Sequence, residues 1–264
     1  MLQYVKLFLC LIFLSCKAYA IPLEDSGDAP NLFGLEGLSE NNAIGANFIE
    51  GDIAVPLQTG RAAYIRSPKW PNGIVPFDIH SLYTNDQKSV IRGAMSEIMK
   101  STNNCIRFVE RNSSTPVWLR IFPGQGCWSY MGRVKSRGAQ DLSLQATGCV
   151  HHSVALHELT HALGFVHEQT RPDRNQYVLI QTENIQSGKE HNFNIFPSTS
   201  VSTLNLPYDY GSIMHYRSDA FSSNGRPTIK AIIDTGKDWD STMGRGKNLS
   251  NLDIAKLKAY YSCS

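Results

Sequence analysis

The sequence contains no apolar run long enough to cross a bilayer. The longest such run, from Leu7 to Leu14, has eight residues, whereas a transmembrane helix needs about 18 to 20. The run follows Lys6, and a small-residue pattern that ends at Ala20 comes after it. These features predict an export signal over residues 1–20 that is cleaved after Ala20. We therefore expect a secreted, extracellular protein without a membrane anchor.

A strong net charge of one sign is also missing. The chain has 25 Lys and Arg against 23 Asp and Glu, and its basic residues form no clusters, which argues against nucleic acid as a partner. Its 42% apolar and 10% aromatic residues are typical of a folded protein and argue against general disorder.

The charges are nevertheless distributed unevenly along the chain. Residues 21–61 carry seven acidic residues and one basic residue, a balance of −6, whereas residues 62–264 carry 22 basic and 16 acidic residues, a balance of +6. The two parts should attract each other. The acidic part has no long periodic pattern and ends at Arg61, where a trypsin-like protease would cleave before Ala62. Composition leaves two alternatives for it, a pro-segment or a disordered N-terminal tail.

Cysteine is scarce in the exported part of the chain. Of six cysteines, two lie in the predicted signal, which leaves Cys105, Cys127, Cys149 and Cys263. In an oxidising compartment these four predict two disulfide bonds, for which three connectivities exist. Two Asn-x-Ser triplets, at Asn112 and Asn248, are candidate glycosylation sites, although such triplets are common by chance.

We expect residues 62–264 to form one domain, because about 200 residues can bury a single core. Its hydrophobic patterns predict strands at 73–79, 106–109 and 117–122, helices at 86–101, 153–163 and 251–261, and a glycine-punctuated, loop-rich stretch from 124 to 138.

The most informative motif is His-Glu-x-x-His at residues 157–161. Residues four apart on a helix lie one above the other, so His157 and His161 can bind the same zinc ion. Glu158 lies beside them and need not bind the metal. Its carboxylate can take a proton from a water molecule whose pKa zinc lowers from 15.7 to about 7, and can pass the proton to a leaving amine.

A third histidine follows at a spacing that requires the helix to end. A straight helix would place His167 about 9 Å beyond His161 and on another face. Gly164 lies between them and can adopt the left-handed conformation that turns the chain back. Three neutral histidines leave one position open, as a catalytic zinc site requires, and they disfavour a purely structural zinc site. The sequence therefore predicts one Zn²⁺ as cofactor.

The number of fixed residues in this motif determines how probable a chance match is. The short form alone would suit an ordinary amphipathic helix as well, but all five fixed residues of His-Glu-x-x-His-x-x-Gly-x-x-His are present. Chance would produce them in a chain of this length on the order of once in ten thousand sequences. Other histidines lack such spacing and are interpreted as surface or packing residues: His80, His151, His152 and His191.

A methionine turn lies about fifty residues downstream, as SIMHY at residues 212–216. Together with HELTHALGFVHEQ at residues 157–169, it resembles the astacin family of zinc endopeptidases within the metzincins. The resemblance extends from Ala62 to Cys263 and includes three further stretches: Cys105–Phe108, Gly126–Arg133 and Arg171–Val178.

The resemblance implies an α+β fold of the metzincin, or zincin-like, type. Its upper half would hold a twisted, mostly parallel five-stranded sheet and two long helices above an active-site cleft, and its lower subdomain would be largely irregular. It also implies disulfide bonds that join Cys105 to Cys263 and Cys127 to Cys149.

The resemblance further implies roles for three residues. Tyr216 would be an additional zinc ligand in the resting enzyme that swings away to hydrogen-bond the tetrahedral intermediate, as a phenol donor can. Met214 would form an apolar floor under the metal. Glu168 would reach the new N-terminal ammonium of Ala62 and complete an ion pair on maturation.

One motif in the acidic part favours the pro-segment interpretation. Phe48-Ile49-Glu50-Gly51-Asp52 resembles the inhibitory Phe-x-Gly-Asp motif of the family, with one extra residue after Phe48. Asp52 could then occupy the open position of the zinc site as a latch, since carboxylate oxygen is a good zinc ligand. The alternative is a surface turn at Gly51-Asp52.

We therefore expect a secreted zinc endopeptidase, made as a zymogen and consisting of a signal (1–20), a pro-segment (21–61) and a protease domain (62–264). Its partners would be protein or peptide substrates and an activating protease, and it would act as a monomer without the additional modules of larger relatives. The alternative is a secreted zinc-containing binding protein that has lost hydrolysis. Because His157, Glu158, His161, His167 and Tyr216 are all present, the enzyme is favoured.

Overall fold

The computed structural model describes residues 46–56, 68–233 and 235–264. The predicted signal, the start of the acidic part and the predicted cleavage site between Arg61 and Ala62 lie outside these residues. Within the described ranges, no helix is both long and apolar enough to cross a membrane.

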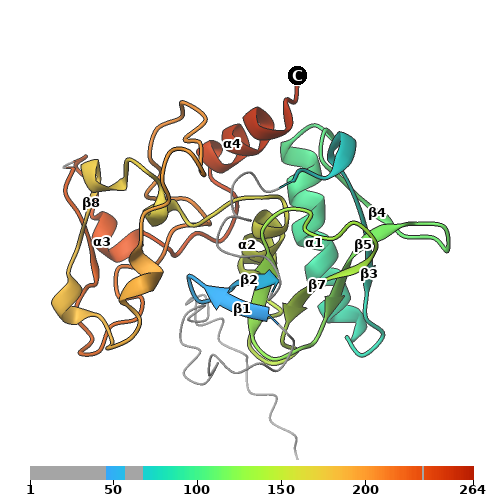
Figure 1. Cartoon of the computed structure of the whole chain (residues 1–264), viewed down its shortest axis with the longest axis horizontal. Helices are drawn as coiled ribbons and strands as arrows, with labels where there is room; N and C mark the ends of the chain where they lie inside the picture. Colours follow the sequence, from blue (N-terminus) through green and yellow to red (C-terminus); the bar gives the residue numbers. More distant parts are fainter. Residues whose placement is uncertain (1–45, 57–67, 234) are drawn as a thin grey trace, which may run out of the picture.

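A seven-stranded mixed sheet forms one half of the molecule (Figure 1). Its strands, in spatial order, are β1 (Ala46–Ile49), β2 (Ile53–Pro56), β6 (Cys127–Tyr130), β7 (Gly138–Leu144), β5 (Val117–Phe122), β3 (Ile74–Ile79) and β4 (Arg107–Glu110). Strands β7, β5, β3 and β4 are parallel to one another, and β6 is antiparallel to β7. This confirms the mostly parallel five-stranded sheet that the resemblance implies. The hairpin β1–β2, from the acidic part of the chain, extends it by two strands.

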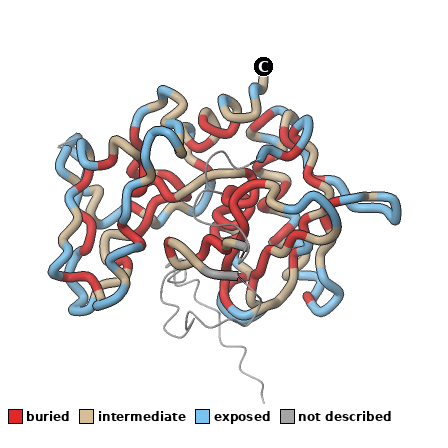
Figure 2. The backbone as a smooth tube through the Cα atoms, viewed as in Figure 1, coloured by how far each residue is buried: buried red, intermediate tan, exposed pale blue. Residues whose placement is uncertain are grey.

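Two helices pack together beside this sheet, α1 (Asn85–Ser101) and α2 (His152–Ala162). Thr84 begins α1 with a capping box, in which its side chain and that of Gln87 each bind the other residue's backbone N–H. One apolar face of α1 is buried, whereas α2 is buried on all sides from Ser153 onward (Figure 2). A helix enclosed in this way holds its side chains in fixed positions.

The other half has little regular structure (Figure 1). It contains β8 (Val178–Ile180), paired with β9 (Ile229–Ala231), and the short helix α3 (Trp239–Thr242). Single turns of 3₁₀ helix occur at Pro71–Gly73, Glu168–Thr170, Arg174–Gln176, Thr182–Asn184 and Glu190–Phe193. Stacked aromatic pairs, Tyr177 with Tyr208 and Tyr210 with Trp239, contribute to a second core here.

The C-terminal helix α4 (Asn251–Tyr261) has the bounds that its periodicity predicts. Ser250 caps it by accepting a hydrogen bond from the backbone N–H of Asp253. Leu257 joins the main core, and the Tyr261 hydroxyl donates to the carbonyl of Leu163 at 3.0 Å. The helix is therefore attached directly behind the end of α2.

The loop-rich prediction for residues 124–138 missed the strand β6, although residues 124–126 and 131–137 around it are loops. Gly126 and Gly138 have φ angles of 73° and 79° and stand where these strands begin. The glycines thus mark turns at strand ends. Fully buried strands such as β6 also lack the alternating pattern that identifies half-buried ones.

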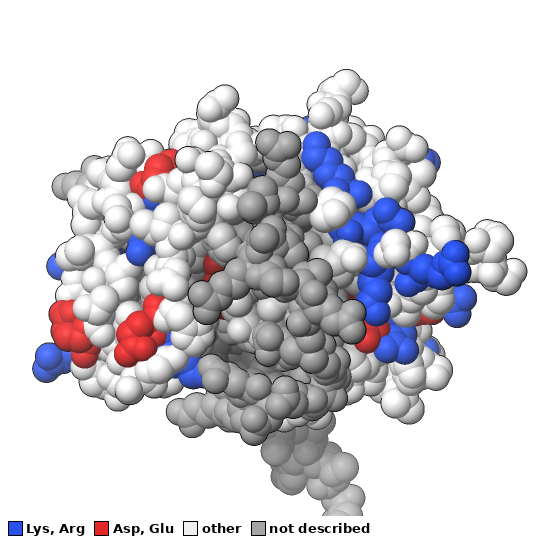
Figure 3. Space-filling view, in the orientation of Figure 1, with Lys and Arg blue, Asp and Glu red and all other residues white. Residues whose placement is uncertain are grey.

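Charged side chains are unevenly distributed on the face in Figure 3. Lys and Arg gather on the half with the sheet, and Asp and Glu are more frequent on the other half. On this face, the basic residues therefore lie mainly on the half that contains the sheet.

Candidate metal centre

Helix α2 places His157 and His161 one turn apart, with ring centroids 4.6 Å apart and both side chains buried. The Nε2 atoms of the two rings lie 3.0 Å apart. Each ring is oriented by a backbone carbonyl: Nδ1 of His157 donates to Ile213 at 2.8 Å, and Nδ1 of His161 donates to Phe165 at 2.7 Å. Because a carbonyl can only accept, these bonds leave the Nε2 lone pairs facing the centre.

The helix ends at Ala162, and the chain turns at Gly164, where φ is 109°. A side chain there would be strained in this conformation, and its Cβ would lie 3.1 Å from the ring of Tyr260. The turn brings His167 back, with its Nε2 atom 3.2 Å from that of His157. The structure thus brings together the three histidines, by the route expected from the sequence.

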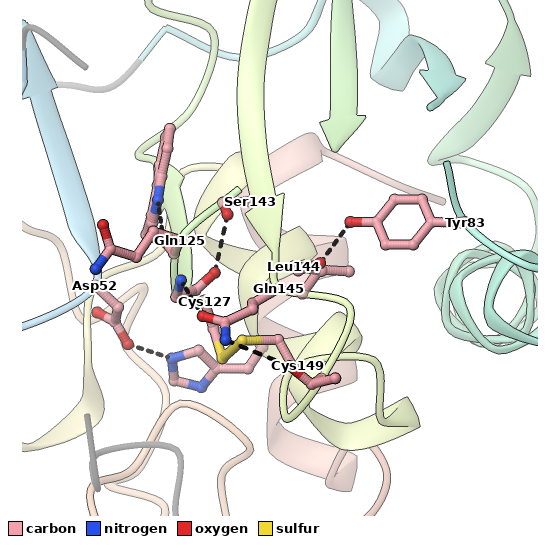
Figure 4. The surroundings of a disulfide bond; sticks show 12 residues. Asp52, Tyr83, Gln125, Cys127, Ser143, Leu144, Gln145 and Cys149 are labelled. Atoms are coloured by element: carbon pink, nitrogen blue, oxygen red, sulfur yellow. Dashed lines mark hydrogen bonds and ion pairs between the residues drawn. A yellow bond between two sulfur atoms is a disulfide. The ribbon is translucent and has the colours of Figure 1, made fainter. Parts of the chain in front are cut away.

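Asp52, in the turn of the β1–β2 hairpin, supplies a fourth donor. Its Oδ2 atom lies 3.2 Å from Nε2 of His157 and 3.4 Å from Nε2 of His167, and its Oδ1 atom lies 3.6 Å from Nε2 of His161. Figure 4 shows Asp52 directed at an imidazole beneath the strand that carries Cys127. The four ligand atoms lie within 4.8 Å of one another, and all four residues are buried.

This donor set fits a single zinc ion. Three imidazole nitrogens and one carboxylate oxygen are ligands that zinc accepts in tetrahedral geometry. Within the described part of the chain, Asp52 Oδ1 has no hydrogen-bond partner although it is buried, and such an orphaned acceptor indicates that a cation belongs beside it. Burial lowers the pKa of His161 to about 4, so this ring is neutral, as a metal ligand must be. At His167 burial is outweighed by the carboxylates of Asp52 and Glu50, which raise the pKa to about 9, so a metal must displace a proton from that ring.

Glu158 follows His157 on α2 and is fully buried. Neither of its buried carboxylate oxygens has a hydrogen bond among the described residues. Burial, and then the negative charge of Asp52, raise the pKa of Glu158 well above its usual range. A carboxylate with a raised pKa is a better proton acceptor at neutral pH, which suits a general base.

The methionine turn brings Tyr216 close to the centre. Tyr216 is fully buried, with its ring centroid 4.5 Å from that of His167. Its hydroxyl donates to the carbonyl of Glu50 at 2.5 Å. Met214 is buried in the main core, and its carbonyl accepts from the backbone N–H of Glu168 at 2.9 Å.

Glu50 is a functional candidate that the sequence reasoning missed. Its buried carboxylate accepts a hydrogen bond from Nδ1 of His167 at 2.5 Å. The following Gly51 has a φ of 85°, and a Cβ there would lie 3.0 Å from the ring of Phe221. An acidic residue directly before Gly51-Asp52 was the available signal, but only the folded hairpin shows what it reaches.

Glu168 has two cationic partners within the chain, and Ala62, whose ammonium it is expected to reach, lies outside the described residues. Its Oε2 atom lies 2.7 Å from Nζ of Lys256, and its Oε1 atom lies 3.1 Å from Nη1 of Arg171. All three side chains are buried. Nothing in the sequence pattern indicated Lys256, which lies 88 residues further along the chain.

Both disulfide bonds have the connectivity that the resemblance implies. Cys105–Cys263 joins positions 158 residues apart and fastens the end of the chain behind α4, and Cys127–Cys149 lies beside Asp52 and joins β6 to the segment before α2 (Figure 4). The candidate glycosylation residues Asn112 and Asn248 are both exposed.

Of the remaining histidines, His152 contacts Glu97 at 2.6 Å, on α1. His80 and His191 are exposed, as is His151 at the start of α2. Their positions agree with surface and packing roles.

Comparisons with known proteins agree on one family. Residues 63–262 match the peptidase family described as Astacin. The chain is 35% identical to zinc metalloproteinase nas-13 of Caenorhabditis elegans over 95% of its own length, and it spans about half (53%) of that relative. It is 38% identical to low choriolytic enzyme of Oryzias latipes over 84% of this chain and 81% of that protein.

A solved structure is similar as well. High choriolytic enzyme 1, a hatching enzyme zinc-protease from Oryzias latipes, matches with a TM-score of 0.66 and 37% identity, over 78% of this chain and 98% of that one.

Proposed function

Because the chain belongs to the astacin family of zinc peptidases, we propose that it is a secreted zinc-dependent endopeptidase that is made as a zymogen. It would hydrolyse peptide bonds in protein or peptide substrates. The observation that carries the proposal is the pairing of the four-donor group with Glu158, a buried carboxylate that has no hydrogen-bond partner among the described residues.

Zinc, when bound, supplies a Lewis acid that polarises the substrate carbonyl and lowers the pKa of water to about 7. The chain's own contribution begins with Glu158, which accepts a proton from the attacking water and delivers it to the leaving amine. Burial is the first cause of its raised pKa, and it favours the protonated form that the group must hold between the two steps. His157 and His161 keep their orientation through the carbonyls that fix their Nδ1 atoms.

Tyr216 would act on the developing oxyanion. Its hydroxyl now donates to the carbonyl oxygen of Glu50, so departure of the hairpin would release a hydrogen-bond donor next to the metal. A donor aimed at charge that develops only in the transition state lowers the barrier selectively. In the precursor, burial and then the charges of Asp52 and Glu50 raise the pKa of Tyr216 well above its usual range, so the phenol is protonated there and donates to the hairpin.

Latency would come from the hairpin that carries Asp52. Strand β2 pairs with β6, and the backbone N–H of Ser129 donates to the carbonyl of Asp52 at 3.0 Å. Phe48 packs edge-on against Trp128 with ring centroids 5.6 Å apart. These contacts hold the Asp52 carboxylate at the position that a catalytic zinc site keeps open for water.

Activation would follow proteolysis between Arg61 and Ala62 and dissociation of the acidic segment. The chain would reach the extracellular space through its export signal and act there as a monomer. These parts of the proposal rest on the sequence pattern, since the residues concerned lie outside those that the structure describes.

The direct test is cleavage of a quenched peptide library by the full chain before and after nicking with trypsin, with its zinc content measured. We expect hydrolysis that appears only after nicking and disappears with a chelator. Activity of equal size before nicking would refute the zymogen proposal. Bound zinc without hydrolysis after verified nicking would refute the enzyme and support the zinc-containing binding protein.

A further inference from the structure

The carboxylate of Glu168 is the centre of a buried ion cluster directly after the third histidine, His167. Its Oε1 atom accepts from Nη1 of Arg171 at 3.1 Å and from the backbone N–H of Asp209 at 2.8 Å, and its Oε2 atom accepts from Nζ of Lys256 at 2.7 Å. Relative exposures are 4% for Glu168 and 7% for Lys256. Both oxygens are therefore occupied, and both cations belong to the folded domain.

The cluster joins three separate segments of the chain. The backbone N–H of Glu168 donates to Met214 in the methionine turn, and Lys256 belongs to α4. Helix α4 is in turn attached to the end of α2 through Tyr261 and Leu163. A displacement of Glu168 would therefore move the histidine next to it relative to α2 and the methionine turn.

We propose that Lys256 is a positioning residue for His167 and acts through Glu168. Its ammonium supplies, from within the domain, the cation that the family resemblance assigns to the new N-terminus. A buried carboxylate needs such a partner, and here it has one before any cleavage. Activity after maturation therefore does not depend on which residue begins the processed chain. The inference rests on the proposed function, since it concerns the processed enzyme.

The surroundings of the cluster support this assignment. A cavity of about 460 Å³ borders Glu168, Arg171 and Lys256. An N-terminal ammonium that entered it would meet one carboxylate already paired with two cations. Asp173 neutralises part of this charge by binding Arg171 at 2.8 Å. The electrostatic gain from a third cation is therefore small compared with that at an unpaired carboxylate.

The test compares two N-termini in the full chain, processed in each case after Arg61. One precursor has the natural sequence, and the other has Gly-Ser inserted between Arg61 and Ala62, so that its processed terminus is two residues longer. Mass spectrometry verifies both termini, and kcat/KM is measured on one peptide. The comparison is repeated in K256M, in the double variant K256M/E168Q, and in K258M, which removes a partly exposed lysine of the same helix.

We expect extension of the N-terminus to lower kcat/KM of the unsubstituted enzyme and of K258M by less than about twofold. In K256M the same extension should lower kcat/KM by about tenfold or more, which is the scale of effects from residues behind metal ligands. In K256M/E168Q the dependence on the terminus should vanish, because no carboxylate then needs a cation. A tenfold loss in the unsubstituted enzyme would overturn the inference, and so would a K256M enzyme that is indifferent to its terminus. If K256M does not fold, the comparison of the unsubstituted enzyme with its natural and its extended N-terminus still tests the inference. Absence of chelator-sensitive hydrolysis in every form would instead refute the proposed function.

Discussion

Oε2 of Glu50 lies 2.5 Å from Nδ1 of His167, whose other ring nitrogen faces Asp52 at 3.4 Å. One hairpin turn thus contacts the same histidine on both sides, with one carboxylate among the metal donors and another behind the ring. The second contact gives the hairpin a charged hydrogen bond in addition to its strand pairing. The proposed inhibition by this segment would therefore depend on two acidic residues.

The first prediction concerns these two residues in the uncleaved precursor. D52A should produce hydrolysis without nicking, because the position facing the three histidines is vacated. E50Q should also release some activity, because its amide oxygen can still accept from Nδ1 of His167 but the hydrogen bond is no longer charge-assisted. Hydrogen bonds to charged groups are worth roughly 1 kcal/mol more than neutral ones, or about fivefold in occupancy. E190Q alters an exposed glutamate and serves as the control. Hydrolysis by uncleaved chains is measured with trypsin inhibitor present, and unchanged latency of D52A would show that another group blocks the site.

The second prediction separates metal binding from proton transfer. E158Q should retain zinc but reduce kcat/KM of the nicked protein by about 10²- to 10⁴-fold, the usual contribution of a general base. H161A should lose both zinc and hydrolysis, because it removes a ligand. Zinc is measured by elemental analysis beside the peptide assay. Near-normal hydrolysis by E158Q would exclude the role proposed for Glu158.

The third prediction is a pH dependence of stability that arises at His215. Burial lowers the pKa of His215 to about 4, and its Nε2 atom lies 2.7 Å from the Tyr208 hydroxyl. Between pH 6.5 and 4 the unfolded chain binds a proton at His215 that the folded chain does not. The stability that neutral His215 contributes is therefore present above pH 6.5 and is lost as the pH falls through this window. The free energy of unfolding falls by at most about 1.4 kcal/mol per pH unit from this group.

Denaturant unfolding of the chelator-treated precursor at several pH values would test this. H215Q should show a shallower decline of stability from pH 6.5 to 4 than the unsubstituted protein, and H80Q, which alters an exposed histidine, should not differ from it. Parallel pH profiles for H215Q and the unsubstituted protein would contradict the assignment.

The fourth prediction concerns removal of the metal. Zinc that binds the folded precursor and not the unfolded chain stabilises the fold, so a chelator should lower the Tm of the precursor. A ligand at about 1,000 times its Kd stabilises the folded state by about 4 kcal/mol. Calorimetry with and without chelator measures the shift, and readdition of zinc should reverse it. A smaller shift is expected for D52A, which has three of the four donors, and equal shifts would argue against Asp52 as a ligand.

The amino-acid sequence within short segments determined much of this site. His157, His161 and Gly164 could be assigned from spacing alone, because helix geometry over a few residues fixes which side chains share a face and where the helix must end. The same holds for α1 and α4, whose apolar periodicity and caps lie within single segments. The disulfide connectivity required the family resemblance as well.

Only the tertiary structure decided the contacts between distant segments. The bond from His167 to Glu50 spans 117 residues, and that from Lys256 to Glu168 spans 88. Neither has a local periodic signal, because a buried charge takes whichever partner the packed elements bring within reach. The strand β6 escaped prediction for a related reason, since a fully buried strand between glycine turns has no polar face to reveal it.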